Sequence, residues 1–123
     1  MGYDELIEEI FSSSLRIRYV AVMDATGRVI AGGMREGVEP LGSESDGKRF
    51  VSDVVLFRHV REEWNRLFGR VRFNLSSREK LNIISFYLNG DTLLITTEPD
   101  VSLLIIDRVM DILREHGLIK EKG

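Results

Sequence analysis

The segment Leu81–Leu88 constrains the fold of this chain more than any other. It reads Leu-Asn-Ile-Ile-Ser-Phe-Tyr-Leu, so that Ile83 and Ile84 stand side by side. Successive residues of a strand point to opposite faces of a sheet, and a strand with apolar residues on both faces is covered on both sides. The segment therefore predicts a central strand of a sheet that carries further structure on each face.

A hairpin and one preceding strand extend this sheet. Asn89-Gly90 separates Leu81–Leu88 from the next strand-like segment, Thr92–Thr97. The dipeptide favours a type I′ turn, which requires positive φ at both positions. Val71–Leu75 supplies a third strand before them. The last part of the sheet is therefore expected to be an antiparallel meander.

A second hairpin lies nearer the N-terminus. The strand-like segments Arg18–Asp24 and Arg28–Gly32 are joined by Ala25-Thr26-Gly27, which is typical of a type I turn closed by a left-handed glycine. Residues 33–47 follow as the longest irregular stretch, rich in glycine and polar side chains. The two hairpins and Val71–Leu75 together predict five strands.

Helical periodicity marks both ends of the chain. The first helix carries one apolar stripe, formed by Tyr3, Leu6, Ile7, Ile10 and Phe11. The last helix is predicted to open at Pro99-Asp100 and to end near His116, before Gly117. Apolar residues cover much of the surface of this last helix, which favours a position against the sheet.

The middle helix is predicted from Ser45 to Leu67, after a capping box formed by Ser43 and Asp46. One broad side of the helix is apolar and is assigned to the core: Phe50, Val54, Phe57, Val60, Trp64 and Leu67. Val51 and Val55 lie away from that cluster and form a second apolar patch. A helix with a core face and a further apolar patch is typical of one that has a second partner.

These elements predict a single α/β (α+β) domain over residues 1–123. Their order is helix, two strands, helix, three strands, helix. The expected architecture is a five-stranded, mainly antiparallel sheet with helices on both faces. The middle helix must cross one face to connect the hairpin to the meander, and the terminal helices then cover the other face.

Composition excludes several classes of protein. The chain has no cysteine, which excludes disulfides and thiolate chemistry and fits a reducing compartment, so a cytoplasmic location is expected. The net charge of -3 makes nucleic acid an unlikely partner for the chain as a whole. No apolar run approaches the ~18 residues of a membrane span, and acidic residues stand where a signal peptide would be basic.

Catalytic patterns are missing from the sequence. It has no Gly-x-Ser-x-Gly motif, and His59 and His116 have no evident serine or aspartate partner. Ala31–Gly37 is rich in glycine, but it lacks the Gly-Lys-Ser/Thr ending of a phosphate-binding P-loop, so a flexible connection is the favoured interpretation. We therefore expect no enzyme activity, no catalytic residue and no cofactor.

One group of residues has metal-ligand chemistry. His59, Glu62 and Glu63 fall within one helical turn and could hold a metal ion. The same predicted helix also carries Arg58, Arg61 and Arg66. Because these arginines can pair with the glutamates, a salt-bridged surface is the favoured interpretation, and no metal site is expected.

Charge is distributed unevenly along the chain. Residues 48–80 hold 9 basic and 4 acidic residues, net +5, whereas both flanking parts are net acidic. This basic block favours an acidic protein partner. Nucleic acid is the weaker alternative, because Phe57, Trp64 and Phe68 are expected in the core and would not form a stacking platform.

The hairpin Tyr19–Gly33 reads Tyr-Val-Ala-Val-Met-Asp-Ala-Thr-Gly-Arg-Val-Ile-Ala-Gly-Gly, with an Asp-x-x-Gly turn between an apolar strand and a strand ending in small residues. Together with the order and size of the other elements, it resembles the roadblock (dynein light chain) family, in the profilin-like and longin-like fold group. The resemblance covers almost the whole chain. With the following Met34–Gly37 segment, the hairpin also resembles uncharacterised archaeal proteins.

The resemblance implies dimers joined through the middle helix and the strand after it, and a role in scaffolding or regulating small GTPases or signalling complexes. The dimer or partner surface would comprise Val51, Val55, Arg58, His59, Glu62, Arg70, Val71, Arg72 and Phe73. The leading hypothesis is a non-enzymatic, dimerising adaptor for a protein partner. The alternatives are a small-ligand sensor of the PAS or GAF type, which the large apolar residues disfavour by predicting a filled core, and a nucleic-acid binder through residues 48–80.

Overall fold

The computed structural model describes residues 2–120, so Met1 and residues 121–123 of the expected domain lie outside it. The chain forms nine elements within this range: α1 (Asp4–Ser12), β1 (Ile17–Met23), β2 (Val29–Met34), α2 (Glu44–Glu62), α3 (Asn65–Phe68), β3 (Phe73–Ser77), β4 (Asn82–Tyr87), β5 (Thr92–Thr97) and α4 (Leu104–Glu115). The predicted α+β order is confirmed, with the short α3 as an addition.

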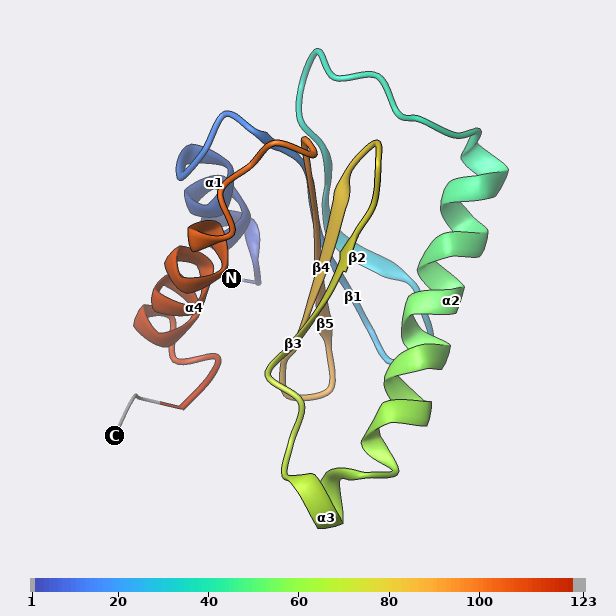
Figure 1. Ribbon diagram of the computed structural model, residues 1–123, viewed down its shortest axis with the longest axis vertical. Helices are drawn as coiled ribbons and strands as arrows, with labels where there is room; N and C mark the ends of the chain where they lie inside the picture. The colour runs from blue at the N-terminus through green and yellow to red at the C-terminus, as the bar shows by residue number, and fades with distance from the viewer. Residues whose placement is uncertain (1, 121–123) are drawn as a thin grey trace.

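The five strands form one antiparallel sheet in the order β2-β1-β5-β4-β3. β5 occupies the middle, so β4, predicted as the central strand, is an interior strand one place away from it. α1 and α4 cover one face and α2 covers the other (Figure 1). The predicted helices on both faces are therefore confirmed.

The main hydrophobic core lies between the sheet and the α1–α4 pair. It contains sixteen buried apolar residues, among them Ile10, Val20, Phe86 and Val109, each with no exposed surface. A much smaller cluster lies under α2. Its five buried members are Met23, Val51, Val54, Val55 and Leu94. α2 is thus the less deeply packed of the two layers.

Both predicted hairpin turns are present, and one of them has a different turn type from the predicted one. Gly27 closes the β1–β2 turn with φ of 87°, as predicted for a left-handed glycine. At Asn89-Gly90 only the glycine has positive φ, 85°, so the predicted type I′ turn is wrong although the β4–β5 hairpin is present. Within β2, Gly32 at φ 85° lies against β1, where an added Cβ would be 2.1 Å from the Val20 carbonyl oxygen.

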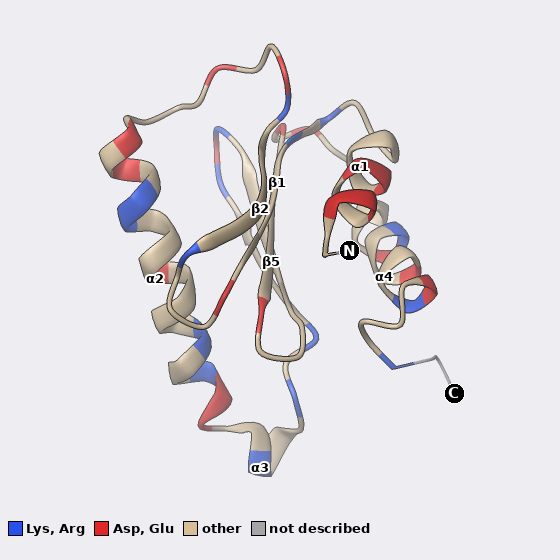
Figure 2. Cartoon of the chain, turned by 180° about the vertical axis from the view of Figure 1, so that it is seen from behind, with Lys and Arg blue, Asp and Glu red and all other residues tan. Residues whose placement is uncertain are grey.

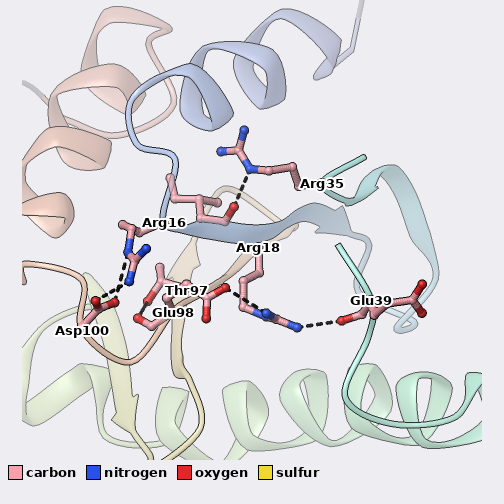
Figure 3. Close-up of polar contacts among 8 residues, drawn as sticks. Arg16, Arg18, Arg35, Glu39, Thr97, Glu98 and Asp100 are labelled. Atoms are coloured by element: carbon pink, nitrogen blue, oxygen red, sulfur yellow. Dashed lines mark hydrogen bonds and ion pairs between the residues drawn. The ribbon is translucent and has the colours of Figure 1, made fainter. Parts of the chain in front are cut away.

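Two helix boundaries differ from the predictions. α2 ends at Glu62 rather than Leu67, and a separate turn, α3, carries the chain round to β3. α4 begins at Leu104, not at Pro99-Asp100, because the Asp100 carboxylate binds the Arg16 guanidinium instead of capping a helix (Figure 3). The capping box predicted for Ser43 and Asp46 is confirmed at the start of α2.

Candidate partner surface

α2 faces the sheet with small side chains. Val51, Val54 and Val55 are 7–9% exposed and pack against Met23 and Leu94. The predicted exposed patch at Val51 and Val55 is therefore wrong. Because valine side chains are short, α2 can approach the sheet closely with this side facing it.

Arg58 anchors the C-terminal half of α2 to the β4–β5 turn. Its guanidinium donates to the Leu88 carbonyl at 2.8 Å and to the Asp91 carbonyl, and it lies 3.3 Å from the Glu62 carboxylate. Arg58 is only 9% exposed, so its predicted place on the partner surface is also wrong. A buried guanidinium is stable here because a carboxylate offsets its charge and backbone carbonyls accept its protons.

The large apolar side chains of α2 and α3 face outward instead. We call six of them the outer stripe, each 51–78% exposed: Leu56, Phe57, Val60, Trp64, Leu67 and Phe68. The assignment of Phe57, Val60, Trp64 and Leu67 to the core is therefore wrong. Phe50, also assigned to the core, is 37% exposed, and only Val54 of that set is buried.

Aromatic rings are ordered within the outer stripe. The rings of Trp64 and Phe68 stack with centroids 5.8 Å apart, and the Arg61 guanidinium lies 5.4 Å from the centre of the Phe57 ring. Stacked rings and a cation over a ring each hold a side chain in place without removing it from solvent. The stripe thus presents a partly ordered apolar surface.

The sheet edge next to α3 is the other part of this surface. β3 pairs only with β4 among the strands, so its second edge is open within residues 2–120. Phe73 begins β3 and is 38% exposed, whereas the chain at Arg70–Arg72 is irregular, so the strand starts two residues later than predicted. Arg70 and Arg72 are exposed and Val71 is half-buried.

Basic side chains surround the outer stripe. Figure 2 shows lysine and arginine along α2 and α3, and acidic residues concentrated on α1. The exposed arginines of α2, α3 and the segment before β3 are Arg49, Arg61, Arg66, Arg70 and Arg72. No carboxylate within residues 2–120 forms an ion pair with any of these five. The surface is therefore apolar along its centre and positively charged around it.

The histidine and glutamates predicted as possible metal ligands do not come together. His59 is exposed, and Glu62 pairs with Arg58, as the salt-bridge interpretation predicted. In the described part of the chain, no group of three or more histidine, aspartate and glutamate side chains could hold a metal ion. None of the helices described is long and apolar enough to cross a membrane.

Sequence and structure comparisons place the chain among known proteins. Residues 3–121 match the model of a family of unknown function, DUF6659. The chain belongs to this family. No curated protein matches this DUF6659 member in sequence.

Solved structures similar to this DUF6659 chain carry the roadblock fold. An MglB described as having a tetrameric arrangement has a TM-score of 0.73 at 16% identity, over 91% of this chain and 82% of that one. The gliding protein MglB from Thermus thermophilus has a TM-score of 0.69 at 16% identity, over 90% and 84%. A roadblock/LC7 domain from Streptomyces avermitilis has a TM-score of 0.65 at 10% identity, over 94% and 98%. At such identities the likeness shows the fold alone, and it confirms the predicted resemblance to the roadblock family.

Proposed function

We propose that residues 1–123 form one roadblock-like domain without catalytic activity, which pairs with a second copy of itself and binds a protein partner in the cytoplasm. The observation that carries this proposal is the outer stripe. Folded proteins seldom leave a contiguous row of large aromatic and aliphatic side chains in water unless another molecule covers it. In this chain the row ends in α3, which leads into β3, the strand with an open edge.

A two-fold arrangement fits this surface best. In an isologous pair the same patch of each copy meets, so an apolar stripe contacts an apolar stripe and one open edge can approach the other. The resemblance to the roadblock family supports α2 and β3 as the contacting elements, and a related fold is described in a tetrameric arrangement. Of the residues predicted for this surface, His59, Arg70, Arg72 and Phe73 are exposed; the outer stripe replaces Val51, Val55 and Arg58.

The first prediction concerns Phe57, near the centre of the outer stripe. Phe57→Glu puts a charge into the proposed contact and should weaken pairing by a factor of about ten or more. We expect light scattering to find a dimer for the unaltered chain and a monomer for Phe57→Glu, with the same circular dichroism spectrum for both.

Leu104 provides the matched control. It is 73% exposed at the start of α4, in the layer on the opposite face of the sheet. Leu104→Glu should therefore leave the dimer intact. A monomer at high micromolar concentration for the unaltered chain, or a dimer for Phe57→Glu, would contradict the proposed pairing.

Charge favours an acidic protein as the further partner, and the resemblance suggests a small GTPase. Arg61, Arg66, Arg70 and Arg72 remain exposed beside the stripe, where they can attract and orient an acidic surface. Nucleic acid is a second candidate. One observation favours it, because Phe57 and other aromatic rings expected in the core are exposed beside arginines and can stack on bases.

One titration separates these two partner classes. We expect a purified small GTPase to bind the unaltered chain, and the double variant Arg70→Glu/Arg72→Glu to bind it more weakly. A single-stranded oligonucleotide should show no affinity even at low salt. Salt-dependent oligonucleotide binding that Trp64→Ala abolishes would favour the nucleic-acid function instead, because base stacking needs the ring.

A further inference from the structure

A cavity of about 890 Å³ lies between the N-terminal half of α2 and the sheet. Its apolar walls are formed by Tyr19, Val29, Met34, Leu41, Phe50 and Leu94. Sites for small molecules in proteins are apolar hollows of roughly 300–1,000 Å³ with a few polar groups, so both the size and the lining fit this class. The expectation of a filled core does not hold on this side of the sheet.

Gly47 contributes to the open space of the cavity. Gly47, Val51, Val54 and Arg58 follow one another at helical spacing, and the last three are buried against the sheet or its turn. Gly47 therefore occupies the next sheet-facing position, where a side chain would enter the space under the helix. A Cβ added to Gly47 would meet nothing within 4 Å.

The glycine is unfavourable for the helix itself. Glycine inside a helix costs about 0.5–1 kcal/mol relative to alanine, and Gly47 lies within α2 with negative φ. Because its neighbourhood is open, close packing does not require glycine at this position. The absence of a side chain here leaves room under the helix at the expense of helix stability.

Hydrogen bonds connect the segments on either side of the cavity. At one end Arg18 donates to the Glu98 carboxylate at 2.9 Å and to the Glu39 carbonyl at 2.7 Å, which ties the loop before α2 to the sheet (Figure 3). Beyond the cavity, in the C-terminal half of the helix, Arg58 connects α2 to the β4–β5 turn. These contacts connect the loop before α2 and the C-terminal half of α2 to the sheet and its turn.

Charged groups at the cavity favour an anion. Arg28 and Lys48 line it, together with the carboxylates of Glu44 and Asp46. Asp46 already accepts a hydrogen bond from the Ser43 amide at 3.0 Å, and Glu44 lies 3.6 Å from Lys48. Arg28 forms no ion pair with any residue from 2 to 120, so its guanidinium is available to a ligand.

We propose that this cavity binds a small, mainly apolar molecule with one anionic group, of the long-chain carboxylate class. The chain of the ligand lies between α2 and the sheet, and its carboxylate pairs with Arg28. The site is on the inward face of α2, so it does not depend on the proposed pairing through the outer stripe.

Dodecanoate is the probe for this proposal, and dodecanol is its neutral counterpart. Titration of the full chain, followed by two-dimensional amide NMR, should give saturable shifts at Tyr19, Gly47 and Leu94. Arg28→Gln should weaken dodecanoate binding by roughly tenfold, the effect of one charge-assisted contact, and leave dodecanol binding unchanged.

Substitutions at Gly47 distinguish a loss of binding caused by occupying the cavity from one caused by a loss of folding. Gly47→Leu should weaken binding while raising the melting temperature, because its side chain takes up part of the cavity and favours the helix. Gly47→Ala should also raise the melting temperature but keep binding. Gly47→Met serves as a second filling variant should leucine prevent folding.

Four results would overturn the proposal. They are the absence of saturable shifts in the unaltered chain, shifts confined to other parts of the fold, unchanged binding in both filling variants, and equal weakening of dodecanoate and dodecanol by Arg28→Gln. A filling variant that loses pairing but retains dodecanoate would show that a second copy, rather than a ligand, occupies the cavity.

Discussion

Arg58 is the side chain on which the position of α2 depends most. It connects the helix to two carbonyls of the β4–β5 turn and lies with its guanidinium 4.8 Å from the centre of the Tyr87 ring. Its burial could not be predicted from the sequence, because arginine is by default an exposed residue and its acceptors are backbone atoms some thirty positions away. The ion pair with Glu62 could be predicted, because it needs only helical spacing.

Arg58→Met tests this role. The variant removes one donor from the Leu88 carbonyl, leaves the Asp91 carbonyl with the Leu88 amide alone, and leaves Glu62 without its cation. The free energy of unfolding should therefore fall by about 2–4 kcal/mol. Urea denaturation at fixed protein concentration measures the change.

Arg49→Met is the control for Arg58→Met. Arg49 lies on the same helix, is exposed, and forms no hydrogen bond or ion pair with the described side chains, so its replacement should change stability by less than about 0.5 kcal/mol. Equal losses in the two variants would show that the turn contacts of Arg58 contribute little.

At the scale of elements, the orientation of α2 is the prediction that the structure contradicts. The strands and the first helix lie within a few residues of their predicted positions, whereas α4 starts at Leu104, five residues after the predicted Pro99. α2 is apolar on two sides, and the prediction assigns the broader one to the core because its residues cluster at helical spacing. The sheet instead accepts the side with Val51, Val54 and Val55, and the space beneath Gly47 is left open. The breadth of the apolar side therefore predicts the wrong orientation for this helix.

The start of α2 depends on pH through Asp46. Hydrogen bonds from the Ser43 amide and hydroxyl lower the pKa of Asp46 below its ordinary value. A lowered pKa in the folded state adds stability above the unfolded pKa of about 3.9, and this stability is lost as the pH falls through the folded value. Asp46→Asn should thus lower the melting temperature at neutral pH, with the difference shrinking in acid.

Thermal melts from neutral pH down to strongly acid conditions measure this effect. Asp53→Asn, also exposed on α2 but without a described hydrogen bond, is the matched variant. A difference between Asp46→Asn and the unaltered chain that stays constant with pH would show that the cap does not act through the Asp46 carboxylate.

At the scale of the whole molecule, the sheet holds two unequal layers that meet at the β4–β5 turn. The Tyr3 hydroxyl donates to the Asp91 carboxylate from the α1 side, and burial raises the pKa of Tyr3 to about 12. Arg58 donates to the carbonyl of the same residue from the α2 side. The order of elements and the presence of two helical layers were predictable from alternating patterns, whereas this shared attachment depends on tertiary contacts that no local pattern encodes.

The proposed pairing of two copies should make the stability of the whole molecule depend on protein concentration. A complex that forms only between folded chains raises the melting temperature by mass action as protein concentration increases. We expect this rise in the unaltered chain and in Leu104→Glu, and its absence in Phe57→Glu. Calorimetry over a wide concentration range measures it, and identical melting temperatures throughout would argue against pairing of folded chains.

The small cluster under α2 also affects how the molecule opens. Sixteen buried apolar residues hold the α1–α4 layer, against five beneath α2. Segments with few buried contacts unfold locally at a lower free energy than the rest of a protein. α2 can therefore detach and return while the sheet and the opposite layer stay folded. Amide hydrogens in the N-terminal half of α2 would then exchange with solvent before those of β1 and β5.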